Sequence, residues 1–173
     1  MANLETQTIS AATSTNSPTG TRTHLPRIAV AGVSGYAGGE LARLLLHHPA
    51  LEGTKPTFLG RAGEAEVGSS TSLEDLHPNL ATAAGAGANP VFPFSWDRIV
   101  DAGINVLFLA TPHDQSREWV PQAIERGIKV IDLSGAWRLQ DSRNRDVYRL
   151  KDADPKLAAT LQAEAVYGCP ELH

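Results

Sequence analysis

The sequence predicts an α/β fold with a doubly wound parallel sheet. Three short apolar runs, at 27–31, 105–110 and 128–133, alternate with segments of helical periodicity. A glycine-rich turn joins the first run directly to its helix. Strands that alternate with helices are joined by right-handed crossovers, which place helices on both faces of the sheet. The 173 residues, 42% of them hydrophobic, are enough to bury the core of one domain.

The first half of the chain contains a helix and a second strand. A leucine-rich stripe after the first apolar run predicts a helix at about 39–47, which Pro49 stops because proline cannot continue a helix. A short strand follows at 57–59. Residues 62–95 have no clear periodicity, and the run Gly-Ala-Gly-Ala-Asn-Pro at 85–90 predicts a loop.

The second half returns to a clear alternation of helices and strands. Residues 96–102 predict one or two helical turns. The continuously apolar run 105–110 predicts a strand buried on both faces, and 128–133 predicts the next buried strand. A helix with proline in its first turn is expected at about 155–162. Residues 166–167 are expected to open a further strand.

One more helix is expected between the two buried strands, at 116–126. Gly127 closes this helix, because glycine readily takes the backbone conformation that follows a helix end. Ser116 is expected to be its N-cap. Pro121 should either kink the helix or delay its start.

Polar and cationic side chains follow each predicted strand. Ligands of parallel α/β sheets gather beyond the carboxyl ends of the strands, so these residues are expected to share one edge of the sheet. Each also has a plain structural explanation, such as a solvated loop histidine at 113 or a surface charge at 138. The strand-end residues are Gly32 to Gly38, Gly60 and Arg61, Thr111, Pro112, His113 and Ser116, and Ser134, Gly135, Trp137 and Arg138.

The glycine-rich turn is the clearest candidate for a binding site. Gly32, Gly35 and Gly38 have the spacing G-x-x-G-x-x-G, one residue different from the commonest dinucleotide fingerprint. Glycines let a ligand approach the backbone, and the free N–H groups and dipole of the following helix favour an anion. Ser34 and Tyr36 add hydroxyl donors. The turn therefore predicts a phosphate cradle; the alternative is a glycine-rich corner without a ligand.

Composition excludes several classes of partner and site. Lys and Arg number 15 against 19 Asp and Glu, a net charge of -4, so no broad basic face for nucleic acid or anionic membranes is expected. Cys169 is the one cysteine, which excludes an internal disulfide and a cysteine-based zinc site. The sequence has no membrane-length apolar run and no secretory signal pattern. These observations favour a cytoplasmic protein, and no metal site is expected.

The residue type at the end of the second strand indicates whether NAD or NADP is bound. An acidic residue there accepts from the ribose 2′-hydroxyl of NAD, whereas a cation suits the 2′-phosphate of NADP. This sequence has Gly60 and Arg61 at that place. The sequence therefore favours NADP, with its adenosine phosphate near Arg61; the alternative is an exposed loop arginine.

A series of short motifs follows in unbroken order over about residues 26–173. The motifs are Gly32-Val-Ser-Gly-Tyr-Ala-Gly38 with Glu40-Leu41, His48-Pro49, His77-Pro78, Phe108-Leu-Ala-Thr-Pro-His113 with Ser116, Val130-Ile-Asp-Leu-Ser134 with Trp137-Arg138-Leu139, and Val166-Tyr-Gly168 with Pro170-Glu171-Leu172. Together they resemble the N-acetyl-γ-glutamyl-phosphate reductases of arginine biosynthesis. Tyr36 in the turn favours this family over aspartate-semialdehyde dehydrogenase.

This resemblance implies an NADPH-dependent reduction of an acyl phosphate to an aldehyde through a cysteine thioester, in an oligomer. It implies a Rossmann-like NADP-binding domain at 25–164, after a Ser- and Thr-rich tail at 1–24 that we expect to be disordered. Residues 165–173 would start a second, α+β catalytic domain, so both the sheet and this second domain are expected to be incomplete. Arg138 would hold the phosphate or carboxylate of the substrate. The implied cofactor contacts are Gly32, Ser34, Gly35, Tyr36, Ala37, Gly38, Pro112, His113, Ser134 and, from its charge, Arg61.

The sequence departs from the family at the catalytic residues. The family's nucleophilic cysteine lies in an Asn-Pro-Gly-Cys segment, and its acid/base histidine lies farther on, both beyond His173. Cys169 occupies the variable place in Tyr-Gly-Cys-Pro-Glu-Leu. We therefore expect an N-terminal fragment that binds NADP without reductase activity. The alternatives are a non-catalytic NADP-binding or subunit-interaction module, and a related acyl-phosphate reductase of the lysine or aspartate pathways.

Overall fold

The computed structural model describes most of the chain after the N-terminal tail. The tail expected at 1–24 lies outside the described part, as do Arg61, Cys169, His173 and most of the loop expected at 85–90. The described residues are 25–60, 71–80, 89–139 and 141–168.

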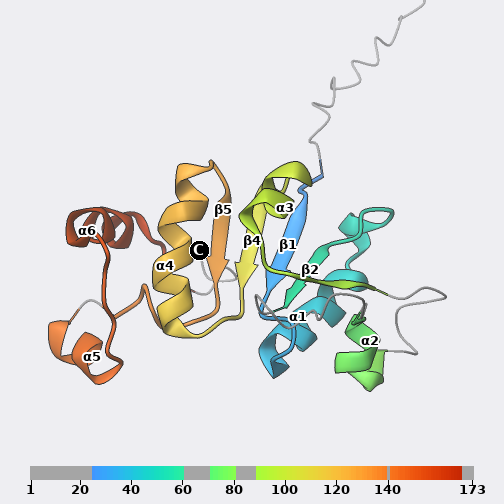
Figure 1. Ribbon diagram of the computed structural model, residues 1–173, viewed down its shortest axis with the longest axis horizontal. Coiled ribbons are helices and arrows are strands. Elements are labelled where there is room, and N and C mark those ends of the chain that lie inside the picture. Colours follow the sequence, from blue (N-terminus) through green and yellow to red (C-terminus); the bar gives the residue numbers. More distant parts are fainter. Residues whose placement is uncertain (1–24, 61–70, 81–88, 140, 169–173) are drawn as a thin grey trace, which may run out of the picture.

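Five parallel strands form one sheet with the order β3-β2-β1-β4-β5 (Figure 1). Val30 of β1, for example, lies opposite Phe58 of β2 and Phe108 of β4. This order matches the first five positions of the 3-2-1-4-5-6 order that is common in doubly wound sheets. The predicted fold class, a Rossmann-like doubly wound α/β sheet, is confirmed. The strands are β1 (Ile28–Ala31), β2 (Thr57–Gly60), β3 (Val91–Pro93), β4 (Val106–Leu109) and β5 (Lys129–Asp132).

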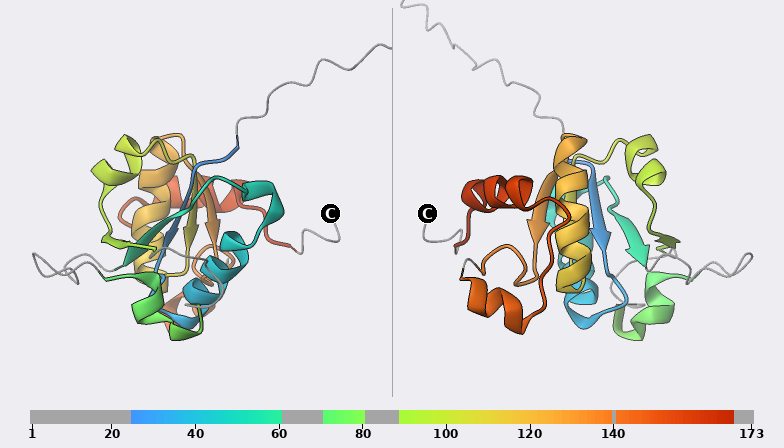
Figure 2. Two further views of the ribbon diagram at one scale, coloured as in Figure 1. Left: turned by 90° about the vertical axis from the view of Figure 1, so that its right-hand side faces the viewer. Right: turned by 60° about the vertical axis from the view of Figure 1, so that its left-hand side comes forward.

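Helices cover both faces of the sheet. Figure 2 shows α1 and α4 on opposite sides of the strands, as crossovers on both faces require. Two single turns of 3-10 helix, Pro49–Leu51 and Pro78–Leu80, follow α1 and α2. The helices are α1 (Tyr36–Leu46), α2 (Leu73–Leu76), α3 (Trp96–Asp101), α4 (His113–Glu125), α5 (Ser142–Val147) and α6 (Pro155–Glu164).

The central strand β1 contributes to two hydrophobic cores because its side chains alternate between the faces of the sheet. Ala29 and Ala31 pack in one core, together with residues of α3, α4 and α6. Ile28 and Val30 pack in the other core, together with residues of α1 and α2. Burial on both faces explains why this strand reads as a continuous apolar run.

Two helices begin earlier than predicted. Helix α1 begins at Tyr36, inside the glycine-rich motif, and the last glycine of the motif, Gly38, is a buried residue of the helix. Helix α4 begins at His113 and runs on through Pro121, so the prediction that proline delays its start is wrong. Ser116 was expected to be the N-cap, but it lies inside α4 and its hydroxyl donates to Asp132.

Other differences concern the sheet edge and the short elements. Strand β5 is at the edge and is not buried on both faces, since Ile131 is 48% exposed. The strand predicted at 166–167 is wrong, because these residues have no regular structure and Val166 is exposed. Strand β3 and helices α2 and α5 were not predicted, because elements of three to six residues are too short to show a periodicity.

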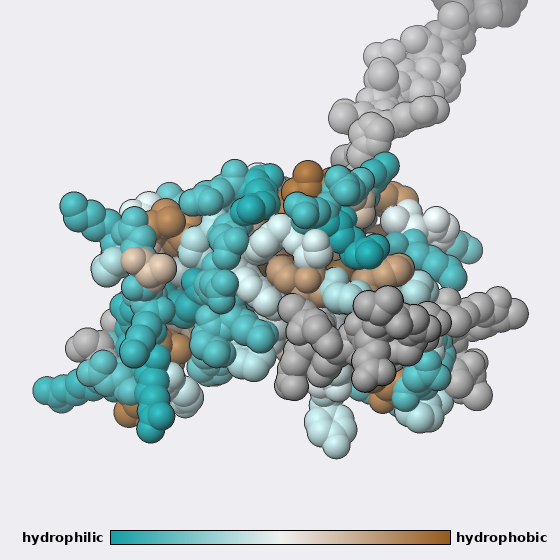
Figure 3. Space-filling view, in the orientation of Figure 1, coloured by the Kyte–Doolittle hydropathy of each residue, from teal (hydrophilic) through white to brown (hydrophobic). Residues whose placement is uncertain are grey.

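Hydrophilic side chains dominate the part of the surface over α4, α5 and α6 that Figure 3 shows, and its brown areas are small and scattered. Such scattered apolar residues are ordinary on a protein surface. Among the described helices, none combines the length and the hydrophobicity that crossing a membrane requires.

Candidate functional site

Three loops meet at the carboxyl edge of the sheet, which is the lower edge in Figure 1. They follow β1, β4 and β5, and they contain the residues 32–35, 110–112 and 133–138. The strand order reverses between β1 and β4, so α1 and α4 leave toward opposite faces and open a crevice there. Such a switch point is where doubly wound sheets bind their ligands.

The loop after β1 packs closely against the loop after β4 at Gly32. Gly32 has a φ of +86°, which favours glycine, and a Cβ atom there would overlap the carbonyl of Ala110. The backbone N–H of Gly32 donates to the carbonyl of Leu59 in β2, with an N–O distance of 3.0 Å. Glycine at this position therefore fixes the start of the turn against both neighbouring strands.

The glycine-rich turn presents backbone N–H groups to solvent. Gly38 packs so closely on Gly32 that a Cβ atom at 38 would overlap its carbonyl, which holds the first turn of α1 against the loop. Ser34 to Ala37 are exposed, and Tyr36 is 97% exposed. The N–H groups of Tyr36, Ala37 and Gly38 have no acceptor within the helix because they are its first three. The turn can therefore donate several hydrogen bonds to one anion.

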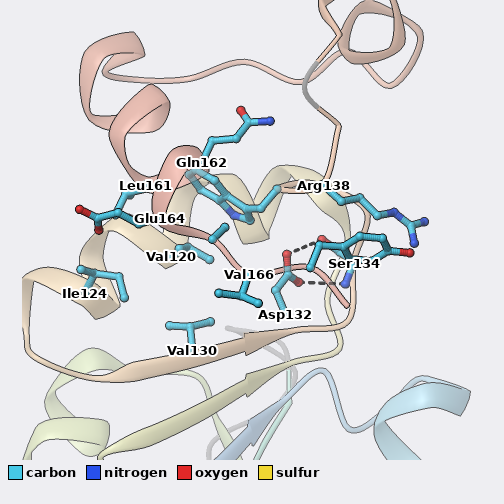
Figure 4. Close-up of a pocket in the computed structure, with 13 residues that line it drawn as sticks. Val120, Ile124, Val130, Asp132, Ser134, Arg138, Leu161, Gln162, Glu164 and Val166 are labelled. Carbon is cyan, nitrogen blue, oxygen red and sulfur yellow. Dashed lines mark hydrogen bonds between the residues drawn. The ribbon is translucent and has the colours of Figure 1, made fainter. Parts of the chain in front are cut away.

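Asp132 of β5, which the sequence interpretation did not include in the site, connects α4 to the loop after β5, and Figure 4 shows its hydrogen bonds to Ser134. Its carboxylate accepts from the hydroxyls of Ser116 at 2.7 Å and Ser134 at 2.8 Å, and from the Ser134 N–H at 2.9 Å. The Ser134 hydroxyl in turn accepts from the Ala136 N–H at 3.1 Å. Asp132 therefore fixes both Ser134 and the start of α4. The signal in the sequence was its place near the end of a predicted strand, two residues before the strand-end residue Ser134.

His113 and Arg138 face the same small space at Gly135. A Cβ atom at Gly135 would lie 3.2 Å from the Nε2 atom of His113 and 3.2 Å from the Nε atom of Arg138. The missing side chain lets the imidazole and the guanidinium both approach the Gly135 backbone closely. Tyr148 lies beside His113 with a centroid distance of 5.3 Å, and the Arg138 guanidinium lies 5.8 Å from the Tyr167 ring centroid.

A buried charged cluster between α4 and the α5–α6 connection contacts the 133–138 loop. Arg117 of α4 is only 5% exposed, and its guanidinium lies 4.2 Å from the ring centroid of Trp137. Its Nη1 atom is 3.2 Å from the carboxylate of Asp152, which also pairs with Arg145. Burial lowers the pKa of Arg117, and the nearby charge of Asp152 opposes this effect. The cluster ties α4, the loop and the α5–α6 connection together.

A pocket of about 510 Å³ opens on the outer side of β5. Figure 4 shows its apolar wall, formed by Val120 and Ile124 of α4, Val130 of β5, Leu161 of α6, and Val166. Asp132, Ser134 and Arg138 form its polar end, and the Arg138 side chain extends away from the apolar wall. The pocket therefore adjoins α4, α6 and the loop after β5 rather than the glycine-rich turn.

The structure thus gathers most of the predicted residues in two places. Gly32, Ser34, Gly35, Tyr36, Ala37 and Gly38 form one turn beside the loop before Pro112. His113, Ser134 and Arg138 lie around the loop after β5. The part of the chain that the structure describes contains no cluster of three or more His, Cys, Asp or Glu side chains arranged for a metal ion.

The strand order and the exposed amide groups define a dinucleotide-binding domain of the doubly wound class. The model of one protein family, "Semialdehyde dehydrogenase, NAD binding domain", matches residues 27–173. The chain belongs to this family. A nicotinamide dinucleotide is accordingly the cofactor class of its fold.

Curated relatives carry two kinds of name. The chain is 38% and 39% identical over 147 residues to the [LysW]-L-2-aminoadipate/[LysW]-L-glutamate phosphate reductases of Sulfolobus acidocaldarius and Sulfurisphaera tokodaii. It is 35% identical over 147 residues to the N-acetyl-gamma-glutamyl-phosphate reductase of Methanocella arvoryzae. These alignments cover 85% of this chain but only 38% to 39% of the relatives. The chain therefore spans about two fifths of the length of these relatives.

Proposed function

We propose that this chain is the NADPH-binding part of an N-acetyl-γ-glutamyl-phosphate reductase. Such an enzyme reduces N-acetyl-glutamyl 5-phosphate to the semialdehyde and releases phosphate, in the biosynthesis of arginine. The observation that carries the proposal is the glycine-rich turn at the switch point of the sheet, where Ser34 to Ala37 are exposed and the N–H groups of Tyr36, Ala37 and Gly38 have no acceptor within α1. The proposed domain is 25–164, and 165–173 would begin a catalytic α+β domain.

The residues of the turn fit a pyrophosphate. The N–H groups of Tyr36, Ala37 and Gly38 would donate to its oxygens, and the positive end of the α1 dipole would favour its charge. Gly35 has room for close approach of a ligand, and the Ser34 side chain is exposed beside it. Hydrogen bonds to charged groups each contribute about 1.5–3 kcal/mol, so three such donors can hold a dinucleotide.

The ends of the dinucleotide would lie toward the neighbouring strands. Strand β2 pairs with β1 and ends at Gly60, and Arg61 is the next residue in the sequence. We assign Arg61 to the 2′-phosphate, which makes NADP rather than NAD the cofactor. Three residues would contact the nicotinamide side: Pro112 and Ser134, in the loops after β4 and β5, and His113, the first residue of α4.

Bound NADPH would supply a hydride, while this chain's residues would hold the substrate beside it. Arg138 lies at the polar end of the pocket and would bind the phosphate or carboxylate of the substrate. The nucleophilic cysteine and the acid/base histidine would come from the catalytic part of the longer protein. The 173-residue chain would then bind NADPH without consuming it. The complete enzyme would be a cytoplasmic homo-oligomer.

The same geometry fits a reductase of the lysine pathway. The identities of 38% and 39% to the aminoadipate/glutamate phosphate reductases favour this second candidate as much as the first. The two substrates differ in chain length and carrier, whereas both present an acyl phosphate. A non-catalytic NADP-binding or subunit-interaction module is the alternative if the longer protein has no nucleophile.

Two measurements test the proposal. Fluorescence titration of the 173-residue chain should show tighter binding of NADPH than of NADH, and Arg61→Ala should reduce this preference. An unchanged ratio of NADPH to NADH affinity would show that Arg61 does not bind the 2′-phosphate. No binding of either cofactor would refute the assignment of the turn as a dinucleotide site.

The chain should oxidise no NADPH when the acyl phosphate is added. Turnover that disappears in Cys169→Ser would show that the nucleophile lies in this chain. Assays of the longer protein with both acyl phosphates would separate the two pathways.

A further inference from the structure

A histidine distant in sequence contacts the glycine-rich turn. The Nε2 atom of His77 lies 2.6 Å from the carbonyl oxygen of Val33, a hydrogen bond across 44 residues of sequence. A carbonyl oxygen can only accept, so the Nε2 atom carries the proton and donates. The neutral Nε2–H tautomer and the imidazolium both meet this requirement.

The His77 ring also packs against the first turn of α1. A Cβ atom at Gly39 would lie 2.5 Å from the Cε1 atom of His77 and 2.6 Å from its Nε2 atom. Gly39 has no positive φ, so its own backbone conformation does not require glycine there. The close approach of the imidazole ring explains the glycine at this position.

The segment that carries His77 is itself firmly anchored. Ser72 and Asp75 form a reciprocal capping box at the start of α2, and Leu73 is fully buried in the core that also holds Val33. Glu74 accepts hydrogen bonds from the Asn89 backbone N–H at 3.0 Å and from its side chain at 2.6 Å. Partial burial acts to raise the pKa of Glu74, but these hydrogen bonds outweigh it and lower the pKa. His77 therefore projects toward the turn from a fixed support.

The hydrogen bond to Val33 determines the direction of the next N–H group. The carbonyl of Val33 and the N–H of Ser34 belong to one planar trans peptide, so they point in opposite directions. Because His77 holds this carbonyl on its own side, the N–H of Ser34 must point away from His77. Ser34 is exposed, and it lies in the part of the turn that precedes the free N–H groups of α1.

We propose that His77 is a positioning residue for the dinucleotide phosphates: it fixes the Val33–Ser34 peptide so that the Ser34 N–H joins the donors of the turn. This inference rests on the proposed function of the turn. Without the hydrogen bond, the peptide can rotate and direct the Val33 carbonyl oxygen toward the bound anion. The site would then exchange one donor for a repulsive acceptor, while the fold itself would keep its strands and helices.

Replacements of His77 in the full 173-residue chain test this role. His77→Gln keeps an N–H donor at a similar reach, whereas His77→Leu keeps bulk without a donor. We expect His77→Leu to weaken NADPH binding by about ten-fold, the effect of losing one hydrogen bond to a charged group, and His77→Gln to restore most of it. His48→Leu is the matched control, because His48 is exposed and its ring accepts only a local bond from the Ala50 N–H.

A second readout does not depend on cofactor binding. Amide hydrogen exchange should be faster at Gly35 and Gly39, whose N–H groups donate to the carbonyls of Gly32 and Gly35 within the turn, in His77→Leu, and near that of the wild type in His77→Gln. Equal affinity and equal exchange in His77→Leu and the wild type would overturn the proposal, as would equal losses in both variants. If the wild type binds no NADPH, the proposed function fails, and the exchange rates still decide whether His77 holds the turn.

Discussion

Replacement of Gly38 by alanine should separate cofactor binding from stability. Gly38 is a buried residue in the first turn of α1, and a Cβ atom there would overlap the carbonyl of Gly32 and lie 2.8 Å from the Cα atom of Val33. These neighbours are backbone atoms, so they cannot move aside as the end of a flexible side chain can. The turn must therefore shift away from the helix.

Two opposing terms set the effect on stability. Overpacking of a close contact costs about 1–3 kcal/mol, while alanine in place of glycine in a helix returns about 1 kcal/mol. The net loss of about 1 kcal/mol corresponds to a fall in Tm of about 2–4 °C for a domain of this size. The effect on binding is larger. A shift of the turn disturbs at least one hydrogen bond to phosphate, so the affinity for NADPH should fall at least about ten-fold.

Gly53→Ala is the matched control. Gly53 has a φ of +84°, and a Cβ atom there would have no atom within 4 Å, so the variant adds backbone strain without a clash. That strain costs about 1–2 kcal/mol, close to the expected loss in Gly38→Ala. Calorimetric titration with NADPH and thermal unfolding of both variants make the comparison. Equal NADPH affinity in both variants would refute the reasoning that the Gly32–Gly38 contact shapes the phosphate site.

Three further predictions concern stability. Asp152→Ala leaves Arg117 buried without its anion and should lower the free energy of unfolding by about 3–5 kcal/mol in urea, whereas exposed Asp146→Ala should change it little. Leu107→Ala, at a fully buried position of β4, should cost about 2–5 kcal/mol in the same assay. The lowered pKa of Glu74 stabilises the fold above the ordinary value of 4.5, and this contribution is lost as the pH falls through the folded value. Glu74→Gln should therefore lose less stability on acidification than the wild type does.

The results that would contradict these predictions are equally specific. Equal urea midpoints for Asp152→Ala and Asp146→Ala would show that the buried pair contributes no net stability. A loss below 1 kcal/mol in Leu107→Ala would mean that the core closes around the removed atoms. If Glu74→Gln and the wild type lose equal stability as the pH falls, the hydrogen bonds between Glu74 and Asn89 do not contribute to acid sensitivity.

The fold could be predicted from the sequence because its central strands are buried on both faces. Continuous apolar runs at β1 and β4, followed by glycine-rich or proline-containing turns, leave few arrangements other than a parallel sheet with crossovers. The edges were harder to predict. Strand β3 has three half-buried residues and no neighbour on its outer side among the described strands, so no period indicates it. At the other edge, β5 shows the same apolar pattern as a central strand although one of its faces is open.

The candidate site was predictable only where its residues follow one another in sequence. The turn from Gly32 to Gly38 is such a case, since spacing alone indicates it. Asp132, His77 and Arg117 act through contacts across 16 to 44 residues or through burial, which no local pattern reports. Ser116 shows the difference well. A serine near a predicted helix start favours an N-cap, but the real start lies three residues earlier and frees its hydroxyl for Asp132.

The three glycines of the motif lie in three different surroundings. Gly32 needs glycine for its positive φ and for the approach of Ala110, and Gly38 needs it for contact with Gly32. Gly35 differs, because a Cβ atom there would meet only the Gly32 carbonyl oxygen at an ordinary 3.6 Å. Gly35 is also the N-cap of α1, where a serine or asparagine side chain would cap the helix as well or better. The fold alone therefore does not require glycine at position 35, whereas a ligand that approaches the backbone of the turn, as the proposed function has it, would gain room from the missing side chain.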